Sequence, residues 1–291
     1  MELQTIIERI DVVPISKNAT ITQLKHEEDD EFYQVWKIQS GAQTYILKES
    51  KGDEGELYAT LLSSVKGYAP TIYQVFSVEE KTYLLMEYIE GENLCRCDRE
   101  KLVRVLDALI GMQKQTWETK GFGSLQHLFD KSLAHRRNRG KYLNDERLEK
   151  AYEKFLAKYS TLPKALCHDD LLPFNCVVCG ERAVLIDWEV GGILPYPTSF
   201  ARLIAHAEDD KNALFYMAEA DKNFAIEYYY QNLLKEKGIS YTEWLQTLEY
   251  FLFYEYCEWV FVGNKYNVTD GEYYKKYFPM AKAQAEKLLS M

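Results

Sequence analysis

The segment His168-Asp169-Asp170-Leu171-Leu172-Pro173-Phe174-Asn175 and the shorter segment Leu185-Ile186-Asp187-Trp188-Glu189 carry the strongest signal in the chain. Between Asn175 and Asp187 the chain has two apolar runs separated by Gly180, which predict a short β-hairpin. That hairpin would gather Asp170, Asn175 and Asp187 in one place. Carboxylate and amide oxygens are the ligands that Mg²⁺ prefers, and a carboxylate can also orient an incoming hydroxyl. Asp and Asn also shape turns for local reasons, so the segment alone leaves both interpretations open.

The spacing within this segment agrees with a pattern of known chemistry. Asp170 and Asn175 are separated as in the kinase pattern H-R-D-x-x-x-x-N, and Asp187 stands where that pattern has the Asp of D-F-G. In phosphoryl transfer the first Asp receives the proton of the acceptor hydroxyl, while the Asn and the second Asp hold Mg²⁺. The sequence therefore predicts Asp170 as the base and Asn175 and Asp187 as metal ligands. His168 is expected to orient the loop.

A lysine and a glutamate upstream supply the complementary part of such a site. Lys48 lies near the end of the strand-like run 43–50, and Glu54 begins a helical segment with an apolar face. A kinase needs a lysine for the nucleotide phosphates and a helix glutamate that holds it. Glu56 is the competing glutamate, but helical spacing puts Glu54 on the side of Leu57 and Leu61. Glu54 is therefore the predicted partner of Lys48.

The pattern of apolar residues changes along the chain. Strand-like runs occupy residues 32–39, 43–50, 71–78 and 81–89, interrupted by one helical segment at 54–65, whereas long helical segments follow at 101–117, 147–160 and from 241 to the end. This predicts an α+β fold with two lobes: an antiparallel sheet with one helix (1–88) and a mainly helical lobe (89–291), joined by a hinge at about 87–92.

Taken together, these motifs resemble the aminoglycoside phosphotransferase and choline kinase family, which comprises small-molecule kinases with a protein-kinase-like fold. The resemblance rests on 46-ILK-48, the E-x-x-L-Y-x-x-L segment from Glu54, 84-LLMEYIEG-91, H-x-D-L-x-P-x-N and 186-IDWE-189. It implies ATP and Mg²⁺ as cofactors, with backbone groups of Glu87, Tyr88 and Ile89 on adenine. No A-P-E-like segment follows IDWE, so a protein substrate is not expected.

Three departures from the family pattern keep a second interpretation open. The segment expected to cover the phosphates has no glycine and contains the acidic run 27–31. Asp169 adds a carboxylate beside Asp170, and two adjacent carboxylates can raise one pKa. The segment after IDWE lacks the acid that often anchors that turn in the family. A weak pseudokinase that acts as a nucleotide-binding module is therefore the alternative function.

The acceptor is predicted from the aromatic-rich segment 250–278. Glu255, Glu258 and Trp259 lie within it, and aromatic faces with carboxylates attract organic cations. The segment resembles the tail of bacterial choline kinases, where aromatic residues enclose a quaternary ammonium, although ordinary core packing is the alternative. An aminoglycoside would use the carboxylates instead. Both acceptors are hydroxylated cations, so the expected partner is a cationic small molecule with a hydroxyl group.

Composition and charge narrow the remaining classes of binding partner and cellular location. The 291 residues carry a formal net charge of −10, which argues against binding to nucleic acid or to anionic membranes. The sequence contains neither a secretory signal nor a membrane span, so a cytoplasmic location is expected, with the six cysteines as reduced thiols. A zinc site built from Cys95, Cys97, Cys176 and Cys179 is a weaker alternative. The charged segment 135–141 is predicted to be a solvated loop, and the oligomeric state is left open.

Overall fold

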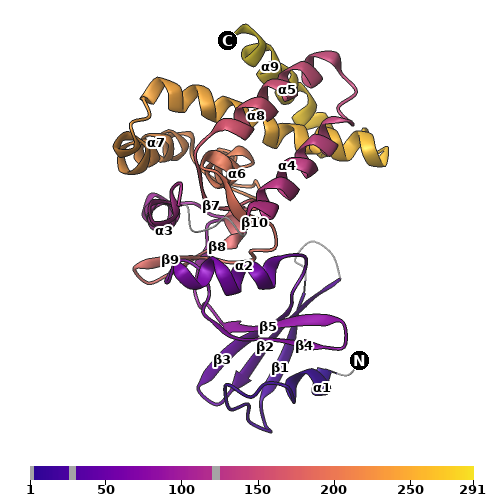
Figure 1. Cartoon of the computed structure of the whole chain (residues 1–291), viewed down its shortest axis with the longest axis vertical. Helices are drawn as coiled ribbons and strands as arrows, with labels where there is room; N and C mark the ends of the chain where they lie inside the picture. The colour runs from indigo at the N-terminus through magenta and orange to yellow at the C-terminus, as the bar shows by residue number, and fades with distance from the viewer. Residues whose placement is uncertain (1–2, 26–30, 120–124) are drawn as a thin grey trace.

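The computed structural model describes residues 3–25, 31–119 and 125–291. A β-sheet lobe lies at one end of the elongated molecule and a helical lobe at the other (Figure 1). Residues 27–30 of the acidic run lie outside the described residues. No helix in the described part of the chain is long and apolar enough to cross a membrane.

The sheet of the first lobe has five antiparallel strands in the order β1-β2-β3-β5-β4. They are β1 (Thr20–Lys25), β2 (Phe32–Ser40), β3 (Gln43–Glu49), β4 (Ile72–Val78) and β5 (Lys81–Glu87). Alternation along β3 separates its two faces: Tyr45 and Leu47 join the core on the outer face, whereas Ile46 and Lys48 face the other way. Lys48 lies in the middle of the sheet, paired with Val35 and Leu84.

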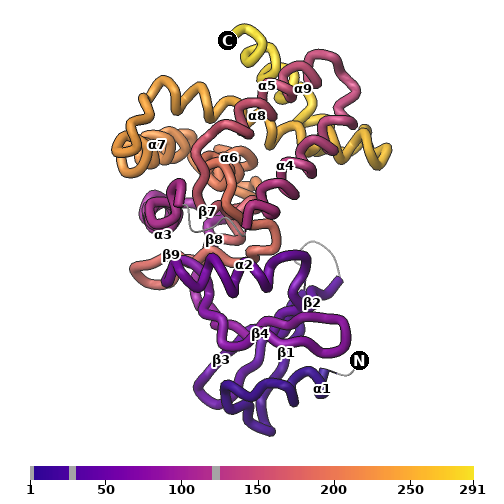
Figure 2. Tube along the Cα trace, in the orientation of Figure 1, coloured from indigo at the N-terminus to yellow at the C-terminus, as the bar shows by residue number. Residues whose placement is uncertain are grey.

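Each face of this sheet is covered by its own helix. The outer face packs against Ile6 and Ile7 of the short helix α1 (Leu3–Ile7), which is an addition to the single helix expected from the sequence. The inner face is covered by α2 (Glu54–Thr60) and the 3₁₀ turn Leu62–Ser64. Figure 2 shows α2 between the sheet and the helical lobe. Glu54 is thereby placed at the junction of the lobes.

The chain passes between the lobes directly beside the predicted hairpin. Strand β6 (Glu92–Asn93) pairs with β8 (Cys176–Cys179), which pairs with β9 (Arg182–Leu185). Gly91 precedes β6, and a Cβ atom there would lie 2.2 Å from the carbonyl oxygen of Val178. The crossing therefore requires glycine, because any side chain would push β6 away from the hairpin.

The second lobe is mainly helical, as predicted. Besides the hairpin it contains the antiparallel pair β7 (Lys164–His168) and β10 (Gly191–Pro195). Three of its helices begin with a side chain that caps a backbone N–H: Asp98, Asp145 and Ser240. Its helical elements are α3 (Arg99–Thr116), α4 (Gln126–Gly140), α5 (Glu146–Thr161), α6 (Pro197–Ala205), α7 (Glu219–Tyr229), the π-helical turn Tyr230–Leu234, the 3₁₀ turns Pro173–Asn175 and Lys235–Lys237, α8 (Tyr241–Tyr266) and α9 (Glu272–Ser290).

The prediction of a solvated loop at 135–141 is wrong in two respects, because the segment is mostly helical and Arg136 is buried, whereas Arg137 and Asn138 are exposed as expected. Most of this segment is the last part of α4, and the Arg136 side chain is 1% exposed. Phe129, Leu133 and Arg136 recur at helical spacing and therefore share the face of α4 that is turned inward. The charge of Arg136 is accepted in the interior because a carboxylate and two aromatic rings surround it, which a charge count along the sequence does not reveal.

Candidate active site

A cavity of about 300 Å³ lies between the lobes. We name it the interlobe cavity. Its apolar lining comes from both sides: Val35, Ile46 and Met86 from the sheet, and Phe174 and Ile186 from the helical lobe. Its polar lining includes Lys48, Glu54, Asn175 and Asp187. The cavity thus offers two apolar walls with charged groups at one end, which suits a flat ring that carries phosphates.

Lys48 is held by two carboxylates in this cavity. Its Nζ atom lies 2.7 Å from Oε1 of Glu54 and 2.5 Å from Oδ1 of Asp187. Burial alone would lower the pKa of Lys48, but the two carboxylates outweigh burial and raise it. Glu56 instead contacts His127 at 3.2 Å. Of the two candidate glutamates, the structure therefore brings Glu54 to Lys48.

The loop after β7 is fixed by hydrogen bonds between its backbone and its side chains. The Nε2–H of His168 donates to the carbonyl of Ile186 (2.7 Å), and its Nδ1 accepts the N–H of Asp170 (3.2 Å). The amide of Asn175 donates to the carbonyl of Asp170 (2.9 Å). Burial lowers the pKa of His168, so the ring stays neutral and keeps one donor and one acceptor. His168 therefore orients the loop.

The missing acid after IDWE has a replacement in the structure. The hydroxyl of Ser199 in α6 accepts the backbone N–H of His168 at 2.8 Å. An uncharged acceptor is sufficient here, because the donor is a backbone amide. The departure noted in the sequence therefore leaves the loop anchored.

Asp187 lies where two cavities meet. It lines the interlobe cavity and also a second cavity of about 310 Å³, which we name the acidic cavity. Its φ angle is +64°, a conformation that costs free energy in a residue other than glycine and that clusters at functional sites. Asn175 and Asp187 both offer hard oxygen donors to the interlobe cavity, so their chemistry fits Mg²⁺.

The predicted hinge begins at the edge of the interlobe cavity. Met86, directly before it, lines the cavity. Glu87 accepts the N–H of Thr71 through its carboxylate (3.1 Å) and pairs with Arg182 (3.0 Å). The ring of Tyr88 lies under the ammonium of Lys37, 4.0 Å from its centroid. The side chains of Glu87 and Tyr88 are thus engaged by neighbours, while Ile89 follows them towards β6.

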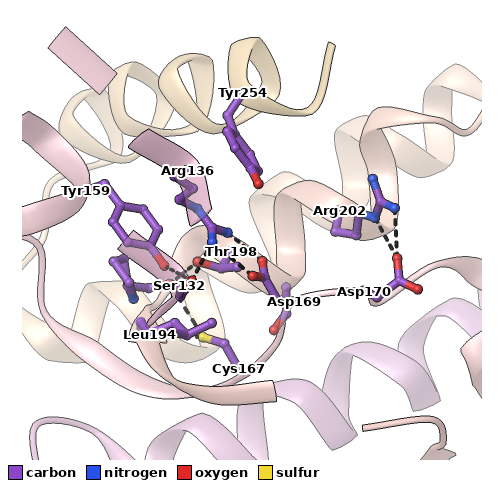
Figure 3. A network of polar contacts seen from close by, with 12 residues as sticks. Ser132, Arg136, Tyr159, Cys167, Asp169, Asp170, Leu194, Thr198, Arg202 and Tyr254 are labelled. Carbon is purple, nitrogen blue, oxygen red and sulfur yellow. Dashed lines mark hydrogen bonds and ion pairs between the residues drawn. The ribbon is translucent and has the colours of Figure 1, made fainter. Parts of the chain in front are cut away.

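Asp169 is paired away from Asp170. Arg136 binds both carboxylate oxygens of Asp169, at 2.9 and 2.5 Å, and its guanidinium lies 4.5 Å from the ring centroids of Tyr159 and of Tyr254 (Figure 3). This arginine compensates the extra carboxylate next to Asp170. The sequence contained no local sign of it, because 33 residues separate the partners.

Asp170 is bound by a second arginine that the sequence did not reveal. Nε and Nη2 of Arg202 donate to the same oxygen, Oδ1, at 3.0 and 2.8 Å, and Figure 3 shows both bonds ending on that atom. Arg202 comes from α6, and its side chain is 12% exposed. A single arginine within an otherwise uncharged helix was the available signal.

The predicted acceptor residues Glu255 and Glu258 meet the same arginine. Nη1 of Arg202 lies 2.9 Å from Oε2 of Glu255 and also contacts Glu258. Glu258 is bound in addition by Arg139, at 3.0 Å. Both glutamates line the acidic cavity together with Asp169 and Asp170, but their carboxylates are already paired with arginine.

Trp259 faces a third cavity, of about 440 Å³, which we name the aromatic cavity. Trp259, Tyr273 and Tyr277 line it, and Trp259 stacks on Tyr273 with 4.2 Å between the ring centroids. The aromatic and acidic cavities share Arg202 and Glu258 as lining residues. A molecule in the aromatic cavity would thus lie next to the arginine that binds Asp170.

The cysteines do not assemble as metal ligands in the described part of the chain. There, the single group of three or more His, Cys, Asp or Glu side chains with ligand atoms within 4.8 Å is His206, Glu255 and Glu258. Cys97 and Cys176 are buried, and Cys95 and Cys179 are half-buried. The thiols of the zinc alternative therefore occupy core and half-buried positions instead of a common centre.

Comparison with known proteins agrees with this fold. The family model described as "Phosphotransferase enzyme family" matches residues 20–229, whereas no curated protein matches the chain. A putative aminoglycoside phosphotransferase from Ralstonia eutropha JMP134 has a similar structure, with TM-score 0.63 and 13% identity over 98% of this chain and 95% of that one. Choline kinase from Cryptosporidium parvum Iowa II has TM-score 0.62 and 14% identity over 97% and 92%. A thermostable mutant of aminoglycoside phosphotransferase APH(4)-Ia, in a ternary complex with AMP-PNP and hygromycin B, has TM-score 0.55 and 12% identity over 99% and 97%.

Proposed function

The chain belongs to the phosphotransferase enzyme family, and from this premise we propose that it transfers the γ-phosphate of ATP to a hydroxyl of a cationic small molecule. The observation that carries the proposal is the arrangement of Lys48, Glu54 and Asp187 beside the Asp170–Asn175 loop. Residues 1–88 would bind the nucleotide, and residues 89–291 would supply the base and the acceptor site.

The nucleotide would occupy the interlobe cavity. Its adenine would lie between the apolar walls, with hydrogen bonds to backbone groups of Glu87, Tyr88 and Ile89, and its phosphates would reach Lys48. Mg²⁺ bound by Asn175 and Asp187 would offset negative charge on the phosphates. Glu54 would keep the ammonium of Lys48 in place, as it does in the structure at 2.7 Å.

Asp170 would act as the base. The acceptor hydroxyl gives its proton to the Asp170 carboxylate while its oxygen forms a bond to the γ-phosphorus. The bond between that phosphorus and the oxygen bridging to the β-phosphate breaks, and ADP leaves with the electron pair. Oδ1 of Asp170 is engaged by Arg202, so Oδ2 is the oxygen assigned to the proton.

The aromatic cavity supports an acceptor with a single ammonium group. Faces of Trp, Tyr and Phe rings attract cations, by about 2 kcal/mol or more where the cation is desolvated, and Trp259, Tyr273 and Tyr277 line this cavity. Glu255 and Glu258 are each paired with Arg202, so they offer less to a polyamine than their charge suggests. A choline-like acceptor is therefore favoured over an aminoglycoside-like one.

The proposal is tested by release of ADP from Mg-ATP in the presence of choline, ethanolamine, thiamine, aminoglycosides or simple sugars. We expect turnover with a cationic alcohol and a loss of about 10²-fold or more in Asp170→Asn, since a positioned base contributes that much. Trp259→Ala should raise the KM for the acceptor, whereas Tyr266→Ala, at an exposed residue of α8, should leave it unchanged. Equal turnover in wild type and Asp170→Asn would refute the assignment of the base.

The alternative function, a nucleotide-binding module without catalysis, makes a different prediction. It requires that ATP binds while no acceptor in the panel is phosphorylated. The paired positions of Lys48, Glu54 and Asp187 favour an enzyme, because these residues have the arrangement that phosphoryl transfer needs.

A further inference from the structure

The environment of Arg202 has features that the proposed reaction does not by itself require. One guanidinium contacts three carboxylates, those of Asp170, Glu255 and Glu258, and a ring nitrogen of His206 at 3.1 Å. The side chain of Glu255 is 3% exposed, and that of Arg202 is 12% exposed. Such a cluster of acids around one cation is costly to bury, so the pairing must be well formed.

Two other occupants of this cluster are less consistent with the contacts. His206, Glu255 and Glu258 have ligand atoms within 4.8 Å of one another, as in a metal site. However, Nη1 of Arg202 already lies within contact distance of all three of these residues. A substrate ammonium would meet the same obstacle, because the arginine occupies the position from which a cation reaches both glutamates.

We infer that Arg202 is a positioning residue that fixes Asp170 for proton transfer, and that Glu255 and Glu258 hold Arg202 instead of binding the acceptor. This inference rests on the proposed function and assigns roles within the same site. Both N–H groups that reach Asp170 end on Oδ1. The carboxylate is thus held from one side, and Oδ2 is left to the acceptor hydroxyl.

The two glutamates determine where the guanidinium lies. Arg139 binds Glu258 from the other side at 3.0 Å, and Tyr254 accepts a hydrogen bond from Arg139 at 2.9 Å. Although burial disfavours the charged carboxylate, Arg202 and Arg139 outweigh it and hold the pKa of Glu258 well below its usual range. Glu258 therefore stays ionised across the physiological range and continues to bind Arg202. The chain of contacts runs from α4 and α8 through Arg202 to the base.

The first test is chemical rescue of Arg202→Ala. We expect kcat to fall about 10²-fold, since small displacements of reacting groups cost that much, while the KM for ATP stays within about twofold. Added guanidinium ion at millimolar concentration should restore kcat in a saturable way, because the ion can refill the space. Urea has nearly the same shape without the charge and should not restore it. Arg99→Ala removes an arginine that pairs with Asp221 and makes no contact with Asp170, so it controls for general effects of guanidinium on the assay.

The second test separates the role of the glutamates from acceptor binding. Glu255→Gln and Glu258→Gln should lower kcat and leave the KM for the acceptor unchanged. An increase in the acceptor KM with unchanged kcat would overturn the inference, because it would show that the glutamates bind the acceptor. Rescue of Arg202→Ala by Zn²⁺ instead of guanidinium would also overturn it and would identify a metal site.

A third measurement does not depend on turnover. Guanidinium should raise the melting temperature of Arg202→Ala but not of the wild type, since only the variant has an uncompensated cluster of carboxylates. If the wild type proves inactive with every acceptor while this stabilisation is observed, the proposed function fails and the placement of Arg202 stands. If the wild type is active but guanidinium neither stabilises nor rescues the variant, the inference about Arg202 fails on its own.

Discussion

The buried pair of Arg136 and Asp169 allows a prediction of stability that is independent of catalysis. In Arg136→Met the side chain keeps much of its apolar length but loses the guanidinium that is 1% exposed and that binds both oxygens of Asp169. Removal of one partner of a buried ion pair costs about 3–5 kcal/mol. Asp169 is 16% exposed and can be partly rehydrated, which places the expected loss at about 3 kcal/mol, the lower end of that range.

The contacts with Tyr159 and Tyr254 contribute less to this loss. A desolvated guanidinium over an aromatic ring gains about 2 kcal/mol, but the thioether of methionine also packs well on aromatic rings. With about 2–4 °C per kcal/mol for a chain of this size, the melting temperature should fall by about 6–12 °C. Urea unfolding followed by circular dichroism measures the same loss as a shift of the midpoint.

A matched variant and a second substitution sharpen the test. Arg137→Met changes the neighbouring, exposed arginine of α4 and should alter stability by less than about 0.5 kcal/mol. Arg136→Met combined with Asp169→Leu removes both charges and should regain most of the loss, since an apolar pair of similar volume is often as stable as a buried ion pair. If Arg136→Met costs no more than Arg137→Met, or the double variant is less stable than Arg136→Met, the reasoning about this pair is refuted.

Three further results are expected. Glu54→Gln should lower kcat strongly and Glu56→Gln should not, as measured by ADP release, because Lys48 contacts only the first of these two residues of α2; equal effects would contradict the pairing. Burial lowers the pKa of His168 below its usual 6.5, so the unfolded chain binds the proton first and stability should fall as the pH drops below about 6.5 towards the folded-state pKa. In His168→Gln the loss of stability caused by His168 should be absent when urea midpoints are measured between about pH 5 and 7.5. If the midpoints of the variant fall with pH as steeply as those of the wild type, the lowered pKa of His168 is contradicted. Burial raises the pKa of Cys167 to about 12, so iodoacetamide should label Cys167 only after the protein unfolds. Half-buried Cys179 should be labelled already in the native protein, as read by peptide mass spectrometry. Equal labelling rates for the two thiols would contradict the burial of Cys167.

The parts of the fold that follow from short-range patterns were predictable. Gly180 between two apolar runs gives the β8–β9 hairpin, and alternation along β3 places Lys48 opposite the outer core. The choice of Glu54 over Glu56 follows from helical spacing alone. In each case the residues that decide the outcome lie within a few positions of one another, so the local backbone geometry is sufficient.

The arginines of the site depend instead on how distant segments meet. Arg136 pairs with Asp169 from 33 residues away, and Arg202 reaches Asp170 from 32 residues away. Local sequence preferences do not bring either pair together, since each pair forms only after α4 or α6 has packed against the loop. The charged run 135–141 looked like exposed surface because charge runs usually are, and only the carboxylate and the rings around Arg136 reverse that expectation.

The same dependence on tertiary packing changes how the acidic cavity is understood. Six acids line it, and their number alone would suggest strong attraction for polyamines: Asp169, Asp170, Asp187, Glu189, Glu255 and Glu258. Four of these acids are bound by Arg136, Arg139 or Arg202, and Asp187 is bound by Lys48. Because most of the negative charge is already compensated within the chain, the selection of the proposed cationic acceptor would fall to the aromatic rings beyond Arg202. Specificity in this site is therefore expected to depend on the shape of one ammonium group more than on the number of charges the acceptor carries.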